Sequence, residues 1–200
     1  MSFVSRLLED PRVYRLHQAP FAEAKLAPVL RHNDLRTVRR VLDVACGPGT
    51  NTAHFGHADY VGLDVNERYI AAARRRHHRT FLVADVTAQL PPLEGRFDCV
   101  LLNSLLHHMS DADARGILQR LRGVLAEDGH VHVLDLVLPD DRGIARLLAR
   151  LDRGAFARPL AGWRRILGEV LEPVVCEPYG VGLLGRTLWN MVYVKGRARA

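Results

Sequence analysis

The chain has 200 residues, of which 48% are hydrophobic and 25% charged, and this composition suits one globular domain, residues 1–200, with a sizeable core. No apolar run reaches the length of a membrane span, and acidic residues come too early for a secretory signal, so we expect a cytoplasmic protein without a membrane span. The net charge is +6, but nearly all of the basic residues are arginine, a skew that biased codon usage also produces, so charge does not favour nucleic-acid binding.

Residues 1–39 precede the first predicted strand and are expected to form an N-terminal helical segment. Residues 1–19 are polar and helix-prone, with Pro11 as a break. Residues 21–31 show an amphipathic helical pattern that Pro28 interrupts.

A short apolar run at residues 41–44 predicts a buried parallel strand, which Gly47, Pro48 and Gly49 stop. Residues 50–52 are all good helix-start residues. Because glycine lacks a Cβ and a helix start offers N–H groups, this turn lets a carboxylate or phosphate approach the backbone. Dinucleotide sites use such a turn, but the third glycine of their pattern is a threonine here.

Residues 59–64 form a second apolar strand that ends in Asp64. In nucleoside-binding α/β folds an acid at this point bonds the ribose hydroxyls. The alternative is that Asp64 only caps the helix predicted for residues 70–76. The arginines that end this helix are expected to form a solvated face.

Further strands are predicted at residues 81–84, 96–103 and 130–138, with a helix that begins at Ser110 or Asp111 and runs to residue 125. Two helices are then predicted between residues 139 and 170. A strand at residues 174–177, a glycine-rich turn and a last strand at residues 188–194 complete the pattern.

The three cysteines, Cys46, Cys99 and Cys176, lie in or beside predicted strands at spacings unlike those of a zinc site. They are expected to be reduced and mostly buried. Asp135 lacks a nearby pair of acids, so the sequence predicts no metal site.

The segment VLDVACGPG resembles motif I of the class I S-adenosylmethionine-dependent methyltransferases, which reads apolar-apolar-Asp-apolar-x-Cys-Gly-x-Gly. The segments RFDCVLLN and SLLHHMSD resemble the strand and turn that follow in the small-molecule branch of this family. The likeness covers residues 40–194 and is strongest over residues 40–138. It implies an α/β fold: a Rossmann-like, doubly wound, seven-stranded sheet in the order 3-2-1-4-5-7-6, with the last strand antiparallel and helices on both faces.

The resemblance also implies S-adenosyl-L-methionine as cofactor and S-adenosyl-L-homocysteine as product. Asp64 would bond the ribose, Asp85 the adenine amino group, and the N–H of Val86 would meet the adenine ring; Asp85 could instead be an ordinary turn residue. The expected cofactor-binding residues are Asp43, Ala45, Cys46, Gly47, Gly49, Asn51, Thr52, Asp64, Val65, Asp85, Val86, Asn103 and His108.

Methyl transfer from an activated donor needs mostly alignment, with a general base only for a poorly acidic acceptor. His107 and His108 are the candidate catalytic bases; alternatively, one packs on a helix and the other lines the cofactor pocket. Something must cover the open edge of the site, so residues 1–39 and the 139–170 insert are expected to form a lid and acceptor pocket. The alternative is a purely structural insert. The candidate substrate residues are Tyr14, His17, Arg158 and Trp163.

The sequence therefore predicts a methyltransferase acting on a small organic acceptor, and arginines in residues 153–165 favour an acidic or phosphorylated one. The alternatives are a methyltransferase of protein or RNA, and a non-catalytic S-adenosylmethionine-binding subunit. An NAD-dependent oxidoreductase is disfavoured because the third glycine is missing and Asp43 and Cys46 are both in register. The sequence does not distinguish a monomer from a homodimer.

Overall fold

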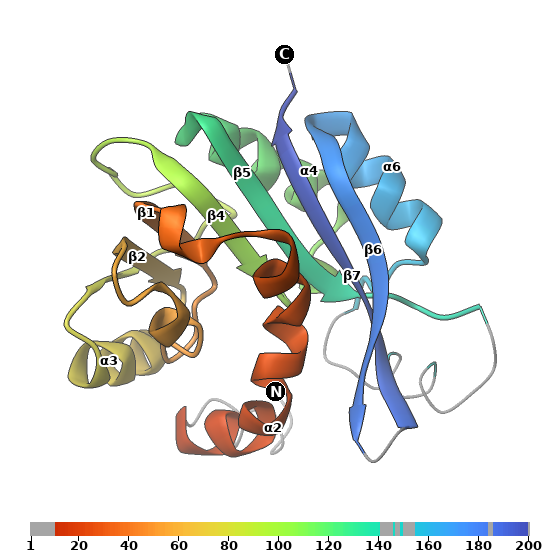
Figure 1. Ribbon diagram of the computed structural model, residues 1–200, viewed down its shortest axis with the longest axis horizontal. Helices are drawn as coiled ribbons and strands as arrows, with labels where there is room; N and C mark the ends of the chain where they lie inside the picture. Colours follow the sequence, from red (N-terminus) through yellow and green to blue (C-terminus); the bar gives the residue numbers. More distant parts are fainter. Residues whose placement is uncertain (1–10, 141–145, 147–148, 150–154, 184–185, 200) are drawn as a thin grey trace.

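The computed structural model describes residues 11–140, 146, 149, 155–183 and 186–199, and for residues 11–20 it describes the backbone alone. A single seven-stranded sheet runs through these residues in the order β3-β2-β1-β4-β5-β7-β6 (Figure 1). Strand β7 is antiparallel to both of its neighbours, and the other neighbouring pairs are parallel. The strand order and the antiparallel last strand that the resemblance implied are thus confirmed.

The first four strands are short and mostly apolar, and all but the edge strand β3 are largely buried on both faces, which is what parallel strands covered by helices require. Their bounds lie within a residue or so of the predicted ones. They are β1 (Arg40–Val44), β2 (Asp59–Asp64), β3 (Thr80–Val83) and β4 (Phe97–Asn103).

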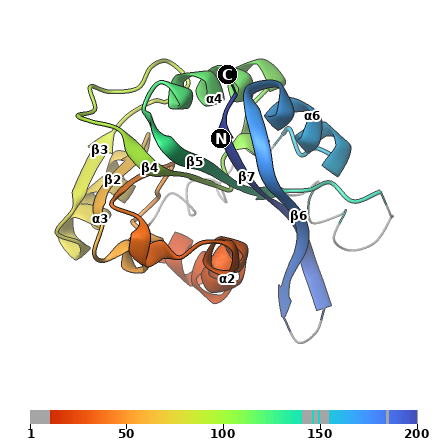
Figure 2. The same cartoon turned by 45° about the horizontal axis from the view of Figure 1, so that its top comes forward.

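The later strands are longer than predicted, β5 modestly and β6 and β7 much more so. Strand β5 spans Leu125–Leu136, β6 spans Leu171–Leu183 and β7 spans Arg186–Ala198. Prolines and glycines within β6 hid its length from sequence reading, but an edge strand tolerates them because one side needs no ladder hydrogen bonds. Figure 2 shows the far part of the β6–β7 hairpin extending past the end of β5.

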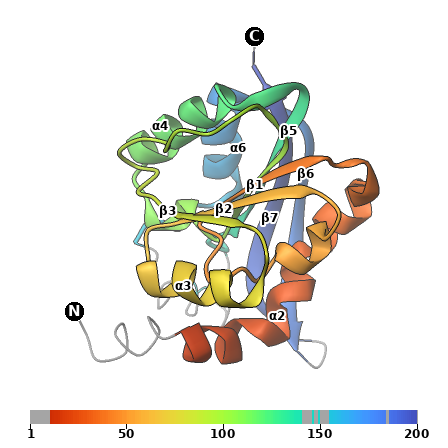
Figure 3. The same cartoon turned by 90° about the vertical axis from the view of Figure 1, so that its left-hand side faces the viewer.

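Helices cover both faces of the sheet (Figure 3). Helices α4 (Asp111–Arg122) and α6 (Leu160–Val170) pack on one face. Helices α2 (Pro11–His32) and α3 (Glu67–Arg76) pack on the other, together with the short 3-10 helix η2 (Thr52–Phe55). The described helices include none that is long and apolar enough to cross a membrane.

Two local predictions need correction, and a third is not tested by the described residues. Helix α2 runs without interruption through Pro28, and its described part begins at Pro11. The helix expected to follow the glycine turn is only the short 3-10 helix η2. The stretch from Gly49 to Asp59 is too short for a longer helix together with the connections that lead into it and out of it. The first helix predicted in the 139–170 insert lies mostly outside the described residues.

Helix α2 is tied to the last two strands by polar contacts. The Asn33 amide donates to the Tyr193 hydroxyl at 3.0 Å, and His32 and Arg31 both contact the carboxylate of Glu177. Because Tyr193 accepts from Asn33, its own proton is directed to Nδ1 of the buried His132, 2.9 Å away. This acceptor role requires a neutral imidazole, and burial lowers the pKa of His132 to about 3.

His132 should therefore make the fold sensitive to acid. Unfolded histidine titrates near pH 6.5, so at mildly acid pH the unfolded state binds a proton that the folded state does not, and stability falls as pH falls. Between about pH 7 and about pH 5 the wild-type protein should lose about 2 kcal/mol more unfolding free energy than His132→Gln. Urea denaturation of both proteins at the two pH values measures this difference. Equal losses would mean that His132 takes up its proton in the folded state.

Candidate active site

The turn after β1 is held open by its backbone conformation. Gly47 and Gly49 have φ of 56° and 78°, and Ala45 has φ of 60°. A Cβ on Gly49 would come within 2.9 Å of the His77 ring, so this position has no room for a side chain. The Cys46 N–H donates to the Leu63 carbonyl at 2.9 Å, which fixes the start of the turn against β2.

Asp64 closes this turn from the end of β2. One carboxylate oxygen accepts from the Gly47 N–H at 2.9 Å and the other from the Asn66 N–H at 2.8 Å. Asn66, and not Asp64, caps helix α3. Burial raises the pKa of Asp64, and these two backbone hydrogen bonds act against that rise. Each carboxylate oxygen can accept a second hydrogen bond, so the group can still receive a ligand's hydroxyls.

Asp43 lies in the middle of β1 and is fully buried. Its Oδ2 accepts hydrogen bonds from the Tyr60 hydroxyl at 2.5 Å and the Asn51 amide at 3.1 Å. Burial raises its pKa to about 6, and the two hydrogen bonds oppose this rise. Asp43 thus anchors the chain that follows the glycine turn, a role that sequence reasoning could not assign because it missed Tyr60.

The turn leaves several buried polar atoms without a hydrogen-bond partner. Among the described residues there are four such side-chain atoms, and three belong to residues 43–52: Asp43 Oδ1, Thr50 Oγ1 and Thr52 Oγ1. A buried polar atom without a partner costs free energy unless a ligand or water satisfies it. These three atoms therefore fit a site for a polar ligand at the turn.

A small cavity of about 30 Å³ lies where the carboxyl ends of β1 and β4 meet helix α2. Ala45 and Ser104, which follow these two strands, are the non-glycine residues with positive φ in the described chain, and both line the cavity. Strained backbone of this kind tends to occur at functional sites. The predicted residues Cys46, Asn51 and Asn103 line it too, together with Ala22, Lys25 and Thr50. Sequence reasoning missed Lys25 and Ser104.

The adenine side of the predicted site is a more open surface. Val65, directly after Asp64, is 67% exposed, although it is apolar, whereas Val86 is buried. The Ala84 N–H donates to the Asp64 carbonyl, so the two strand ends lie side by side. Asp85 is exposed, and its carboxylate accepts from the N–H and hydroxyl of Thr87, which lowers its pKa. Asp85 thus stabilises a local turn, as the alternative interpretation proposed. It also lies next to the predicted adenine-binding surface.

The two candidate bases differ in exposure. The His107 ring is buried, and its Nδ1 lies 2.5 Å from Oδ1 of Asp135, which is also fully buried. The other Asp135 oxygen accepts from the Leu106 N–H at 2.7 Å. His108 is exposed, and its ring lies 4.0 Å from that of His107. The contact between Nδ1 and Asp135 fixes the orientation of the His107 ring.

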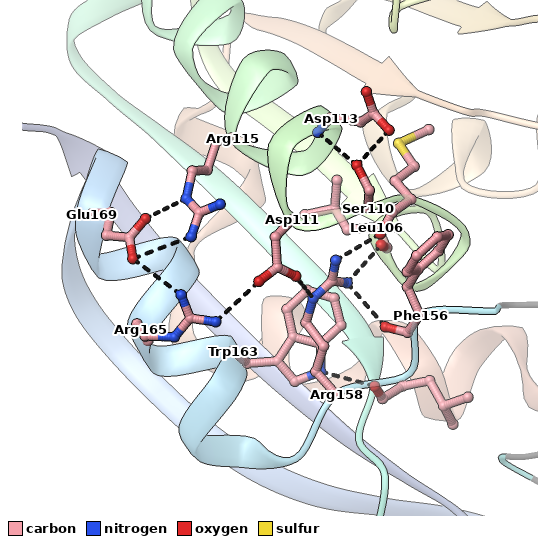
Figure 4. Close-up of polar contacts among 12 residues, drawn as sticks. Leu106, Ser110, Asp111, Asp113, Arg115, Phe156, Arg158, Trp163, Arg165 and Glu169 are labelled. Atoms are coloured by element: carbon pink, nitrogen blue, oxygen red, sulfur yellow. Dashed lines mark hydrogen bonds and ion pairs between the residues drawn. The ribbon is translucent and has the colours of Figure 1, made fainter.

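Arg158 and Trp163 were predicted to line the acceptor pocket, and the structure contradicts this (Figure 4). Trp163 is fully buried, and its indole N–H donates to the Leu136 carbonyl, so it has no surface for an acceptor. The Arg158 guanidinium is 4.8 Å from the Trp163 ring and bonds the carbonyls of Leu106 and Met109. Arg158 thus holds in place the turn that carries His107.

Tyr14 and His17 lie on α2, but their side chains are outside the described part of the chain. Helix α6, the second helix of the predicted insert, packs its buried face on the sheet, as the structural alternative proposed.

A larger depression, of about 380 Å³, lies at the amino ends of β2 and β3 and includes Arg74, His78 and Arg79. None of the predicted site residues lines this depression. We therefore place the candidate site at the glycine turn, on the chemistry of its residues, and not at the larger depression. In the described residues, no three histidine, cysteine or acidic side chains are grouped to hold a metal.

Known proteins resemble this chain over the same region. Residues 41–129, from β1 into β5, match the family model described as a methyltransferase domain. The chain carries a class I S-adenosylmethionine-dependent methyltransferase domain. The glycine turn and Asp64 both lie inside the matched residues of this methyltransferase domain.

The relatives of this methyltransferase domain include small-molecule enzymes. Trans-aconitate 2-methyltransferase of Methylobacterium radiotolerans is 31% identical over 172 residues, which is 84% of this chain and 59% of that protein. Demethylmenaquinone methyltransferase of Beutenbergia cavernae is 33% identical over 106 residues, or 52% of this chain and 43% of that protein. The chain thus spans about two fifths to three fifths of the length of these relatives.

Solved structures share the fold of the methyltransferase domain. The O-methyltransferase NcsB1 from neocarzinostatin biosynthesis, in complex with S-adenosylmethionine, gives a TM-score of 0.70 at 20% identity, covering 100% of this chain and 62% of that one. The N-methyltransferase NodS from Bradyrhizobium japonicum gives 0.68 at 19% identity, covering 90% and 98%.

Proposed function

We propose that this protein transfers a methyl group from S-adenosylmethionine to a small organic acid. The observation that carries the donor assignment is the glycine turn closed by Asp64, with unpartnered buried polar atoms around it. A carboxylate at the end of β2 offers two acceptors to the ribose hydroxyls, and the exposed face of Val65 offers an apolar surface to the adenine ring.

The bound donor would supply an activated methyl group, so the chain's own task is alignment. The turn after β1 and the end of β4 would hold the amino-acid portion of the donor. Asp135 would keep the His107 ring in one orientation beside His108, and these two histidines are the candidate general bases. An acceptor that is already ionised, such as a carboxylate, needs no base.

The acidic acceptor is supported by the relatives named above. They include a methyltransferase of trans-aconitate, which is a carboxylic acid.

A methylation screen tests this function. The protein is incubated with S-adenosylmethionine and trans-aconitate, hydroxynaphthoic acids or neutral phenols, and products are followed by mass spectrometry. We expect a methylated acid. Donor binding with transfer only to added protein or RNA would favour the macromolecular alternative, and absence of donor binding in calorimetry would reject the function altogether.

A further inference from the structure

We propose that Lys25 of helix α2 is the cation of a carboxylate-binding subsite between α2 and the carboxyl ends of β1 and β4. This inference rests on the proposed function and adds to it a specific recognition group. Lys25 is one of only two lysines in a chain whose other basic residues are arginine.

The position of the ammonium carries the inference. Lys25 Nζ donates to the Ser104 hydroxyl at 3.2 Å, and that hydroxyl donates in turn to the Asn103 side-chain oxygen at 3.2 Å. Ser104 has φ of 59°, so its backbone is held in an unfavourable conformation that directs it to this cavity. The ammonium thus lies at the carboxyl ends of β1 and β4. These neighbouring strands form the point of the sheet at which the connections after the two strands run in opposite directions, where ligands bind in open α/β sheets.

A second group in the same cavity supports an anionic occupant. The Thr50 hydroxyl lines the cavity from the glycine-turn side, and its buried Oγ1 has no hydrogen-bond partner among the described residues. It can donate to an oxygen bound in the cavity. An ammonium on one wall and an unsatisfied hydroxyl on the other suit the two oxygens of a carboxylate.

Helix α2 holds Lys25 firmly at this place. The Tyr179 hydroxyl donates to the Lys25 carbonyl at 2.9 Å, which ties the helix backbone at this residue to β6. The cavity of about 30 Å³ holds on the order of two water molecules, less than a carboxylate with its attached carbons needs. The ligand would therefore enter with the Lys25 side chain displaced, and Lys25 would close over it.

Two sources can supply the carboxylate. The amino-acid portion of the donor ends in one, and so does an organic acid acceptor. The two sources differ in which measurement depends on Lys25, so one variant distinguishes them.

The test variant is Lys25→Met, which keeps most of the side chain's length and removes its charge. The matched control is Lys195→Met, which removes the charge of the other lysine, on β7. Calorimetry measures binding of S-adenosylhomocysteine and of 5′-methylthioadenosine, which lacks the amino-acid portion. It then measures binding of trans-aconitate to protein loaded with S-adenosylhomocysteine. Lys195→Met should match wild type throughout.

If the donor supplies the carboxylate, Lys25→Met should weaken S-adenosylhomocysteine about tenfold or more and leave 5′-methylthioadenosine unchanged. If the acceptor supplies it, only trans-aconitate binding should weaken to that extent. The inference is overturned if neither ligand depends on Lys25, or if both nucleosides weaken equally, since that would be general damage to the site. A wild-type protein that binds neither nucleoside would instead reject the proposed function.

Discussion

Replacing Arg158 with alanine should lower the free energy of unfolding by about 3–5 kcal/mol, because it removes a nearly buried charge together with its partners' hydrogen bonds. The guanidinium donates to Asp111 at 2.9 Å and to the carbonyls of Leu106, Met109 and Phe156. Alanine would leave these carbonyls without that donor and would uncover one face of the Trp163 ring. Urea denaturation followed by circular dichroism measures the loss.

Arg165→Ala is the matched control for this change. Arg165 also bonds Asp111, at 3.0 Å, but its side chain is 56% exposed. Exposed ion pairs contribute little, so this variant should lose less than about 1 kcal/mol. Similar losses of unfolding free energy in the two variants would show that Arg158 stabilises the fold through Asp111 and not through the buried carbonyls. Arg158→Lys should remain well below wild type, because an ammonium cannot reproduce the planar fork of donors.

Replacing Asp64 with alanine should weaken S-adenosylhomocysteine binding by about 2–4 kcal/mol, since charge-assisted hydrogen bonds from the ribose to this nearly buried carboxylate would be lost. The same change removes the acceptor of the Gly47 N–H, so the glycine turn should also become less ordered. Calorimetry measures the affinity, and thermal unfolding without ligand measures the structural part of the effect.

Asp85→Ala serves for comparison, because Asp85 is an exposed acid at the end of the neighbouring strand. Its loss should cost about 0.5–1.5 kcal/mol of binding, as expected for one hydrogen bond. Wild-type affinity in Asp64→Ala would remove Asp64 from the site. An effect of Asp85→Ala as large as that of Asp64→Ala would show that the adenine contact matters as much as the ribose contact.

The central sheet was predictable because its strands are uniform apolar runs that end at glycine or acidic residues. Residues 41–44 and 59–64 show this best, since burial on both faces leaves little choice of other structures. The order of the strands came from the family resemblance and not from periodicity. The β6–β7 hairpin was underestimated because pairing with a neighbour, which sequence does not show, overrides the local signals of Pro173 and Pro178.

The roles of single polar residues were harder to predict. Nothing in the sequence distinguishes Arg158, which is 6% exposed, from the exposed Arg165 on the next helix. The burial of an arginine depends on which carbonyls the tertiary fold places around it. Lys25 was overlooked for a similar reason: helix α2 brings it to residues 103–104, which lie far away in sequence. The rarity of lysine in this chain was the one available signal.

The place of β7 between β5 and β6 has a consequence for folding during synthesis. The chain makes β5 long before β7, so the β5 edge has no partner until residues 191–196 leave the ribosome. The groups that hold α2, Glu177, Tyr179 and Tyr193, are also made late. A growing chain can therefore form the first four strands while its N-terminal helix is still undocked. A chain assembled in this order completes the contacts of helix α2 with β6 and β7 last, when the first four strands already exist.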